Sequence, residues 1–418
     1  MRKKSEKDLM VEILEAFKIG VKSVEVHKGP STTLYEITPK IGVKISKIRN
    51  LKDEIAIGLK ADSVRIIAPI PGKGTVGIEV PNKEREILNI ESILSSKEYR
   101  NTNMALPCAI GETITGDILM ADLADMPHLL IAGATGQGKS VGLNTILLSL
   151  MSKRTPNEMK LVLIDPKQVE FGMYSPLDKS YLAYPVINDA ASAQNMLCII
   201  VDEMERRYTR LSNAKVRNIK EYNAIVPTEE KMQYLVVVID EYGDLVMQAG
   251  KQMENLICRI AQKARAVGIH MILSTQRPSV KIVTGDIKAN FPVRIAFRTT
   301  TSTDSRVVLG KKGAENLSGM GDMLFFNNVG TVRAQCAYTS TEDVADFVRE
   351  TSEKYDGTVT ACPIYLLSPE YQKKAAEEEE EKRRIIQKRK DEYREELLKH
   401  TYKPSPSIIR LAEQSGLI

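Results

Sequence analysis

The sequence contains no tryptophan, and it has little cysteine or histidine. Its five cysteines, at 108, 198, 258, 336 and 362, form no CxxC pair, and its four histidines lie far apart. These absences exclude a disulfide scaffold and a zinc site built from neighbouring residues, and they favour a reducing compartment. No apolar run reaches the roughly 18 residues of a membrane-spanning helix. We therefore expect a cytoplasmic location and no transmembrane segment in this chain.

Neither sign of charge dominates the composition. Lys and Arg number 59 and Asp and Glu 54, which gives a net charge of +5 over 418 residues. Because this excess is slight, a surface that binds nucleic acid would have to be local. The hydrophobic share of 43% and the charged share of 27% exclude wholesale disorder.

Hydropathy patterning divides the chain into four segments. Residues 1–95 combine an amphipathic helix with strand-like pieces, which predicts a small α+β domain, and residues 96–107 predict a linker. Residues 108–366 alternate short apolar strands with helices, which predicts an α/β fold with a largely parallel sheet. Residues 367–418 are rich in Glu, Lys and Arg and predict a charged helical tail. The strands expected in the third segment are 129–132, 161–165, 235–240, 271–275, 294–297 and 323–326.

Residues 133–140, GATGQGKS, fit the phosphate-loop pattern GxxxxGK[ST] at every position, between an apolar strand and a helix. Glycines let backbone amides curl around phosphates, and the helix N-terminus adds positive charge. Lys139 would reach the β- and γ-phosphates of ATP, and Ser140 would ligate Mg²⁺. The alternative is a plain glycine-rich turn, which rarely fits every position. The expected nucleotide contacts are Gly133, Ala134, Thr135, Gly136, Gln137, Gly138, Lys139, Ser140 and Val141.

The apolar stretch 234–239 ends in two acids, Asp240 and Glu241, which is a Walker-B pattern. Asp240 would hold Mg²⁺ through its water shell, and Glu241 would polarise the attacking water as general base. An acidic N-cap for the next helix is the alternative. The position about 100 residues after a phosphate loop favours the functional interpretation.

Two further polar residues follow predicted strands at the same sheet edge. Gln276 comes after 271–275 and is our candidate for sensing the γ-phosphate, with a capping residue as the alternative. Asp165 closes 161–164, and there a ligand contact and an N-cap stay equally open.

Basic residues are spread over 277–306, a stretch with many Thr and Ser and few acids. Arg277, Lys288, Arg294, Arg298 and Arg306 suit contacts with a phosphate backbone, although a solvated face is the alternative. By spacing alone, Arg265 is only a basic surface residue.

Taken in order, these motifs resemble the motor domain of the FtsK/SpoIIIE DNA translocases. The matching segments include GATGQGKSVGLN, LIDPKQVEF, VVVIDEYGDLVM and RAVGIHMILSTQRPSVKIVTGDIKANF, and RIIAPIPGKGTVGIEVPN resembles the α subdomain of that family. The resemblance covers roughly residues 20–365. It implies a RecA-like P-loop NTPase core that assembles into a hexameric ring and pumps double-stranded DNA with ATP, as in segregation of chromosome, plasmid or phage DNA.

The resemblance also implies residue roles. Arg265 matches the arginine supplied in trans to the neighbour's nucleotide, with Arg294 and Arg298 as fallback candidates, and Arg277, Lys288 and Arg306 match loop positions that face DNA. TTTSTDSR carries no Lys before DSR, so we expect no second cation in trans. The membrane segments and winged helix of the family are not seen, so a membrane or division-site partner in trans is expected.

Two other functions stay open. A conjugative coupling ATPase would move single-stranded DNA, and the small domain speaks against this. A nucleotide-gated DNA-binding adaptor would have no motor role, and the combination of Lys139, Asp240 and Glu241 speaks against that.

Overall fold

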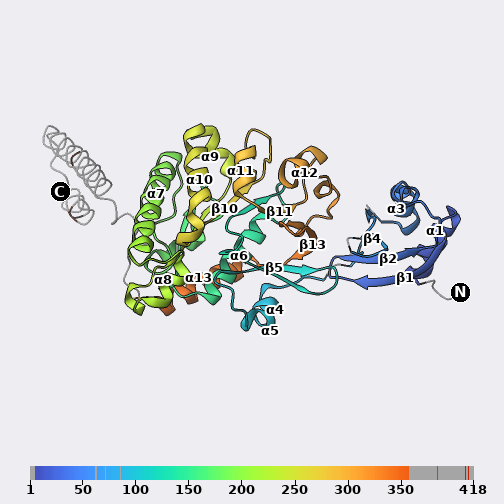
Figure 1. Ribbon diagram of the computed structural model, residues 1–418, viewed down its shortest axis with the longest axis horizontal. Coiled ribbons are helices and arrows are strands. Elements are labelled where there is room, and N and C mark those ends of the chain that lie inside the picture. The colour runs from blue at the N-terminus through green and yellow to red at the C-terminus, as the bar shows by residue number, and fades with distance from the viewer. Residues whose placement is uncertain are drawn as a thin grey trace. The chain divides into compact units, whose positions relative to one another are not determined.

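The computed structural model describes residues 5–356, apart from 62, 63, 71 and 85, and residues 384, 410 and 413. Two β-sheets organise this part of the chain (Figure 1). Met1–Cys362 form one compact unit, which holds both sheets. The predicted end of the motor domain at 366 lies outside the described residues. So does the predicted tail 367–418, apart from residues 384, 410 and 413. Among the described residues, no helix combines the length and the apolar character needed to cross a membrane.

The smaller sheet has four antiparallel strands in the order β1-β2-β4-β3. Apolar side chains from its strands and from three helices share one core, which confirms the predicted small α+β domain. Its elements are α1 (Glu6–Ala16), β1 (Val21–Lys28), β2 (Thr32–Pro39), α2 (Ile45–Arg49), α3 (Lys52–Leu59), β3 (Arg65–Ile67) and β4 (Val76–Pro81).

The larger sheet has nine strands in the order β6-β5-β13-β12-β11-β7-β10-β9-β8. Five neighbouring strands pair in parallel, namely β8 (Met159–Ile164), β9 (Tyr234–Ile239), β10 (Ile269–Thr275), β7 (Leu129–Ala132) and β11 (Val293–Phe297). The remaining four pair antiparallel, namely β12 (Asp322–Phe326), β13 (Thr331–Cys336), β5 (Pro107–Thr113) and β6 (Ile118–Asp122). The α/β fold is confirmed, and the sheet as a whole is mixed.

Every residue of β7, β8 and β10 is buried, because helices cover both faces of the parallel half. These three strands were recognisable in the sequence as short, continuous apolar runs. The helices of this domain are α4 (Ile90–Leu94), α5 (Lys97–Arg100), α6 (Lys139–Lys153), α7 (Ala190–Asn213), α8 (Ile219–Ile225), α9 (Tyr242–Ala249), α10 (Lys251–Lys263), α11 (Gly285–Asn290), α12 (Ser302–Leu309) and α13 (Thr341–Tyr355). Four 3-10 turns complete it, η1 (Gly172–Lys179), η2 (Thr228–Glu230), η3 (Ala264–Val267) and η4 (Ala314–Asn316).

The segment 96–107, predicted as a linker, packs into the larger domain instead. Ile90, Ile93 and Tyr99 are buried in the same core as α6. The Tyr99 hydroxyl donates a hydrogen bond to the Ser149 carbonyl on that helix. The segment is mostly polar, so its buried residues were not predicted. Because Ile90 and Ile93 already belong to the core of the larger domain, the small domain ends earlier than the predicted residue 95.

A buried cluster of four charged side chains joins the two sheets. Arg333 of β13 is 6% exposed, and its guanidinium donates to Asp322 at 2.6 and 2.9 Å and to Glu79 of β4 at 2.6 Å. Glu79 also accepts two hydrogen bonds from Arg65, at 3.0 and 3.1 Å. The two acids and the two bases neutralise each other, which is the condition under which buried charges are tolerated.

Two buried histidines should make the stability of the fold depend on pH. His128 and His270 are 0% and 1% exposed, and burial lowers the pKa of His128 to about 3 and that of His270 to about 4. In the unfolded chain both titrate near 6.5, so below that pH the unfolded state binds more protons. We expect the free energy of unfolding to fall as the pH drops from about 6.5 towards 4, by up to about 1.4 kcal/mol per pH unit for each histidine.

Urea denaturation of the wild type and of His270→Gln between about pH 8 and pH 5 measures this effect. The glutamine amide can still donate to the Pro127 carbonyl, which lies 2.9 Å from His270 Nδ1. The variant should lose stability less steeply below pH 6.5. Identical slopes in the two proteins would show that His270 is not the group that titrates.

Candidate active site

The phosphate loop lies between β7 and α6, at the carboxyl ends of the parallel strands. Gly136 and Gly138 have φ angles of 75° and 110°, which other residues rarely adopt. A Cβ atom on Gly138 would stand 2.8 Å from the backbone of Gly321, so only glycine fits there. Gly321 directly precedes Asp322 of the buried charge cluster. The loop therefore packs against the start of β12.

Lys139 and Asp240 meet inside this site. Lys139 is 3% exposed, and its ammonium group bonds to the Asp240 carboxylate and, at 3.0 Å, to the Ser274 hydroxyl. Ser274 in turn donates to Asp240 at 2.6 Å. The lysine of the loop, the acid after β9 and a hydroxyl of β10 thus form one polar group with balanced charge.

Ser140 faces a carboxylate that our sequence analysis did not select. Its hydroxyl donates a hydrogen bond to Glu170, in the loop after β8. Ser140 and Asp240 offer the oxygen ligands that Mg²⁺ prefers, and Glu170 adds negative charge beside them, so the residues present fit a magnesium ion.

Glu241 is held in a strained and buried position. Its φ is 51°, in the left-handed region, and it is 1% exposed. Its carboxylate accepts hydrogen bonds from the Thr275 hydroxyl at 2.8 Å and the Gln276 backbone N–H at 2.9 Å, and Lys167 Nζ lies 3.7 Å away. The side chain makes no capping bond to α9, which speaks against the N-cap alternative. Such backbone strain costs about 1–3 kcal/mol and often accompanies function.

Gln276 lies beside the phosphate loop, where its side-chain oxygen accepts a hydrogen bond from the Thr135 hydroxyl at 2.7 Å. Asp165 binds loop backbone and is not the N-cap of a helix. It is fully buried and accepts from the backbone N–H groups of Lys167, Glu170 and Phe171 at 2.9–3.1 Å. It therefore fixes the loop 166–171.

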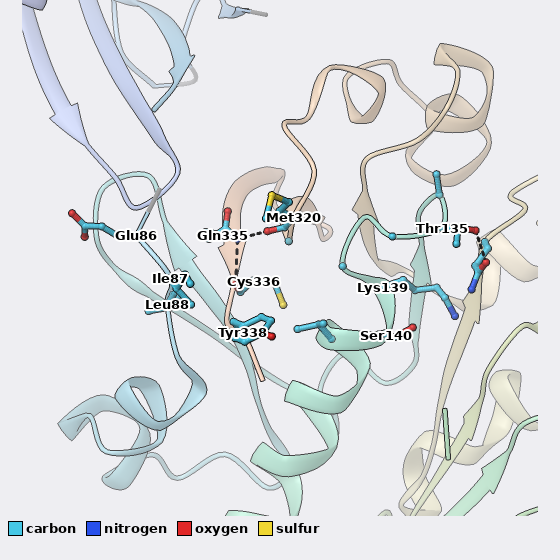
Figure 2. A pocket seen from close by; sticks show the side chains of 16 residues that line it. Glu86, Ile87, Leu88, Thr135, Lys139, Ser140, Met320, Gln335, Cys336 and Tyr338 are labelled. Atoms are coloured by element: carbon cyan, nitrogen blue, oxygen red, sulfur yellow. Dashed lines mark hydrogen bonds between the residues drawn. The ribbon is translucent and has the colours of Figure 1, made fainter. Parts of the chain in front are cut away.

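A pocket of about 480 Å³ extends from the phosphate loop towards apolar side chains (Figure 2). Val141 lines it, as do Gln276 and most of the loop residues predicted to bind nucleotide. Its other wall is apolar and was missed in the sequence, because no motif marks the residues concerned, Ile87, Leu88, Met320, Cys336 and Tyr338. A polar end that carries a phosphate loop and an apolar end of this kind suit a nucleotide with a flat base.

Arg265 does not join this group. It lies in η3 before β10, whereas Gln276 follows β10, and a strand of seven residues spans about 23 Å. The side chain is 61% exposed and lies 4.0 Å from Asp125. Arg265 is therefore at the opposite edge of the sheet from the phosphate loop of its own chain.

The fallback candidates for a cation in trans differ from each other. Arg294 is tied into the fold, because it donates to the carbonyls of Lys288 at 2.6 Å, Phe291 at 2.9 Å and Val308 at 3.4 Å. It therefore links α11 to α12 and is not available to a neighbour. Arg298 follows β11 at the edge where its own phosphate loop lies, and its carbonyl accepts from the N–H of that loop's second residue at 2.9 Å.

The DNA candidates lie on three segments: Arg277 follows β10, Lys288 is on α11 before β11, and Arg306 is on α12 after β11. Arg277 and Arg306 are exposed and Lys288 is half-buried. Because Arg294 bridges the backbones of α11 and α12, Lys288 and Arg306 sit on two short helices held together (Figure 1).

Comparison with known proteins identifies both domains. The model of the FtsK alpha domain matches residues 1–82, and that of the FtsK/SpoIIIE family matches residues 89–280. The DNA translocase FtsK of Borreliella burgdorferi is 47% identical over 348 residues, which cover 82% of this chain and 44% of that protein. The DNA translocase SftA of Bacillus subtilis is 46% identical over 344 residues, which cover 81% and 36%. The chain thus spans less than half the length of these relatives.

Solved structures agree on the fold. The conjugation coupling protein TcpA of pCW3, in its monomer form with ATPγS, aligns with a TM-score of 0.59 and 25% identity over 83% of this chain and 99% of that one. The cytoplasmic domain of the type VII secretion ATPase EccC of Thermomonospora curvata aligns with a TM-score of 0.55 and 25% identity over 63% and 34%. With two matched domains and relatives above 45% identity, the chain belongs to the FtsK/SpoIIIE family.

Proposed function

We propose that this chain is an ATPase that drives the translocation of double-stranded DNA. The observation that carries the proposal is the grouping of Lys139, Asp240 and Glu241 at one phosphate loop, in a chain whose relatives are named DNA translocases. A binding protein without turnover would have no use for a buried, strained carboxylate next to the phosphates.

Each residue would have its own task in this reaction. Lys139 exchanges its bonds within the site for the β- and γ-phosphates of ATP, and the amides of the glycine-rich loop bind the same groups. Ser140 and Asp240 would hold Mg²⁺, which neutralises phosphate charge. Glu241 accepts a proton from the attacking water, and Gln276 is placed to contact the γ-phosphate.

The apolar wall of the pocket would receive the adenine base. Ile87 and Leu88 belong to the connection between the two sheets, and Tyr338 follows β13. Base binding would therefore involve the connecting segment as well as the motor domain.

We also propose that the chain assembles into a ring in the cytoplasm, a homohexamer as in the family. Arg265 lies at the far edge of the sheet from its own nucleotide, so it has a catalytic task only if a second copy presents its pocket there. A partner at the membrane or the division site would then position the ring.

The main alternative is a coupling ATPase that moves single-stranded DNA, and it is favoured by the likeness to TcpA along nearly all of that chain. ATP hydrolysis with competing single- and double-stranded DNA, and displacement of a third strand from a duplex, separate the two functions. We expect duplex to stimulate hydrolysis and the third strand to be displaced. Stimulation by single strands alone would favour the coupling protein, and no hydrolysis at all would favour a DNA-binding adaptor.

Contacts with DNA should be made to the phosphate backbone. Lys288→Ala and Arg306→Ala should each weaken duplex binding about equally on unrelated sequences and flatten the log–log salt dependence by about 0.9 per lost contact. Arg277→Ala should behave similarly. Arg349→Ala, an exposed arginine on α13, is the matched control and should leave the slope unchanged. A changed sequence preference in any of the three variants would contradict backbone contact.

A further inference from the structure

The loop after β8 delivers a carboxylate, that of Glu170, to which the sequence analysis assigned no role. Its backbone is fixed at one side by Asp165, which accepts three of its N–H groups, and at the other by Phe171, which is fully buried in the core. Glu170 lies just before that anchor. The fold therefore sets where this residue stands, and the loop does not depend on the side chain of Glu170 to keep its shape.

The Glu170 carboxylate is directed at the phosphate loop, where it accepts the hydrogen bond of the Ser140 hydroxyl. The other two acids of the site are each next to a lysine, since Asp240 binds Lys139 and Glu241 lies near Lys167. Within the described part of the chain, Glu170 forms no ion pair with a basic side chain. Its charge is therefore the one that no lysine of the site balances.

We propose that Glu170 is a positioning residue of the Mg²⁺ site and acts through Ser140; this rests on the proposed ATPase function. A serine hydroxyl has one proton and two lone pairs. When the proton is donated to Glu170, a lone pair is left to face the cation beside the phosphates. The negative charge of Glu170 also makes the Ser140 oxygen a more basic ligand.

Carboxylates that accept a hydrogen bond from a metal ligand contribute measurably to metal affinity and activity. Their removal typically costs 10–100-fold in metal affinity or activity. Glutamine at position 170 would keep an oxygen that can accept the bond from Ser140 but would lose the charge, whereas alanine would lose both. The two variants therefore separate orientation from charge.

The test is Mg²⁺-dependent binding of a fluorescent ADP analogue to the full chain, followed by anisotropy during a MgCl₂ titration and, separately, in EDTA. Glu170→Ala should raise the half-saturating Mg²⁺ concentration by about 10–100-fold and leave binding in EDTA unchanged. Glu170→Gln should have a smaller effect. Glu229→Gln, the same change at an exposed residue of η2, should match the wild type.

A double-mutant cycle with Ser140→Ala tests whether Glu170 acts through Ser140. If it does, adding Glu170→Ala to Ser140→Ala should cause little further loss. Additive losses, or equal losses with Mg²⁺ and in EDTA, would overturn the proposal, and so would an unchanged Mg²⁺ midpoint in Glu170→Ala. A wild type that binds the analogue without any Mg²⁺ dependence would overturn the role of Glu170, whereas a wild type that does not hydrolyse ATP would overturn the proposed function.

Discussion

Arg265→Ala protein should bind ATP normally and hydrolyse it roughly 10³–10⁵-fold more slowly, which is the range of the rate effect of an arginine supplied from outside the pocket. The guanidinium lies at the far edge of the sheet from its own phosphate loop and is largely exposed. Its loss should therefore leave the pocket of its own chain intact. The missing positive charge would slow hydrolysis in the pocket of the neighbouring copy.

Mixing experiments measure this directly. Rings that combine Arg265→Ala with Lys139→Ala subunits should regain some hydrolysis, because an interface needs only one intact pocket and one intact arginine. Arg259→Ala, an exposed arginine on α10 that pairs with Glu205, is the control and should hydrolyse ATP at the wild-type rate. Absence of recovery at every mixing ratio, in rings verified to be mixed, would exclude action in trans.

Glu241→Gln should retain ATP and Mg²⁺ but lose at least about a hundredfold in hydrolysis, because the amide cannot take a proton from water. The substitution fits the site. The glutamine oxygen can accept the N–H of Gln276, and its NH₂ group can donate to the Thr275 hydroxyl, so the two bonds to β10 can persist. The fold should therefore be unaffected.

Comparison with Lys139→Ala separates chemistry from binding. Lys139→Ala should weaken nucleotide binding itself, because it removes the cation that faces the phosphates. Single-turnover hydrolysis, equilibrium nucleotide binding and thermal unfolding of both variants test these expectations. Near-normal turnover by Glu241→Gln would remove the assignment of the base.

The residues that gather at the phosphate loop could be predicted from the sequence, because they stand in short, contiguous segments. Strands buried on both faces appear as unbroken apolar runs, so 129–132 coincides with β7 and the polar residues after β9 and β10 fall on one sheet edge. The two predicted phosphate contacts that follow the glycines, Lys139 and Ser140, lie in the pocket.

Features that depend on distant segments were not predictable. Ile87 and Tyr338 reach the pocket from two parts of the chain that carry no motif. The role of Arg294 as a link between helices depends on carbonyl groups that only the tertiary structure brings near. Glu170 was the exception, because the stretch DPKQVE directly follows a strand at the ligand edge and could have been examined as a second source of acids.

The charge cluster around Arg333 limits how the two domains of this chain can be exchanged for those of a relative. A chimaera that carried a small domain without an acid at position 79 would leave Arg333 with Asp322 as its remaining acidic partner and would remove its hydrogen bond to Glu79. Losing a hydrogen bond between charged groups costs about 1.5–3 kcal/mol, a sizeable part of the stability of an ordinary domain. The two domains therefore have to be inherited, or engineered, as a matched set.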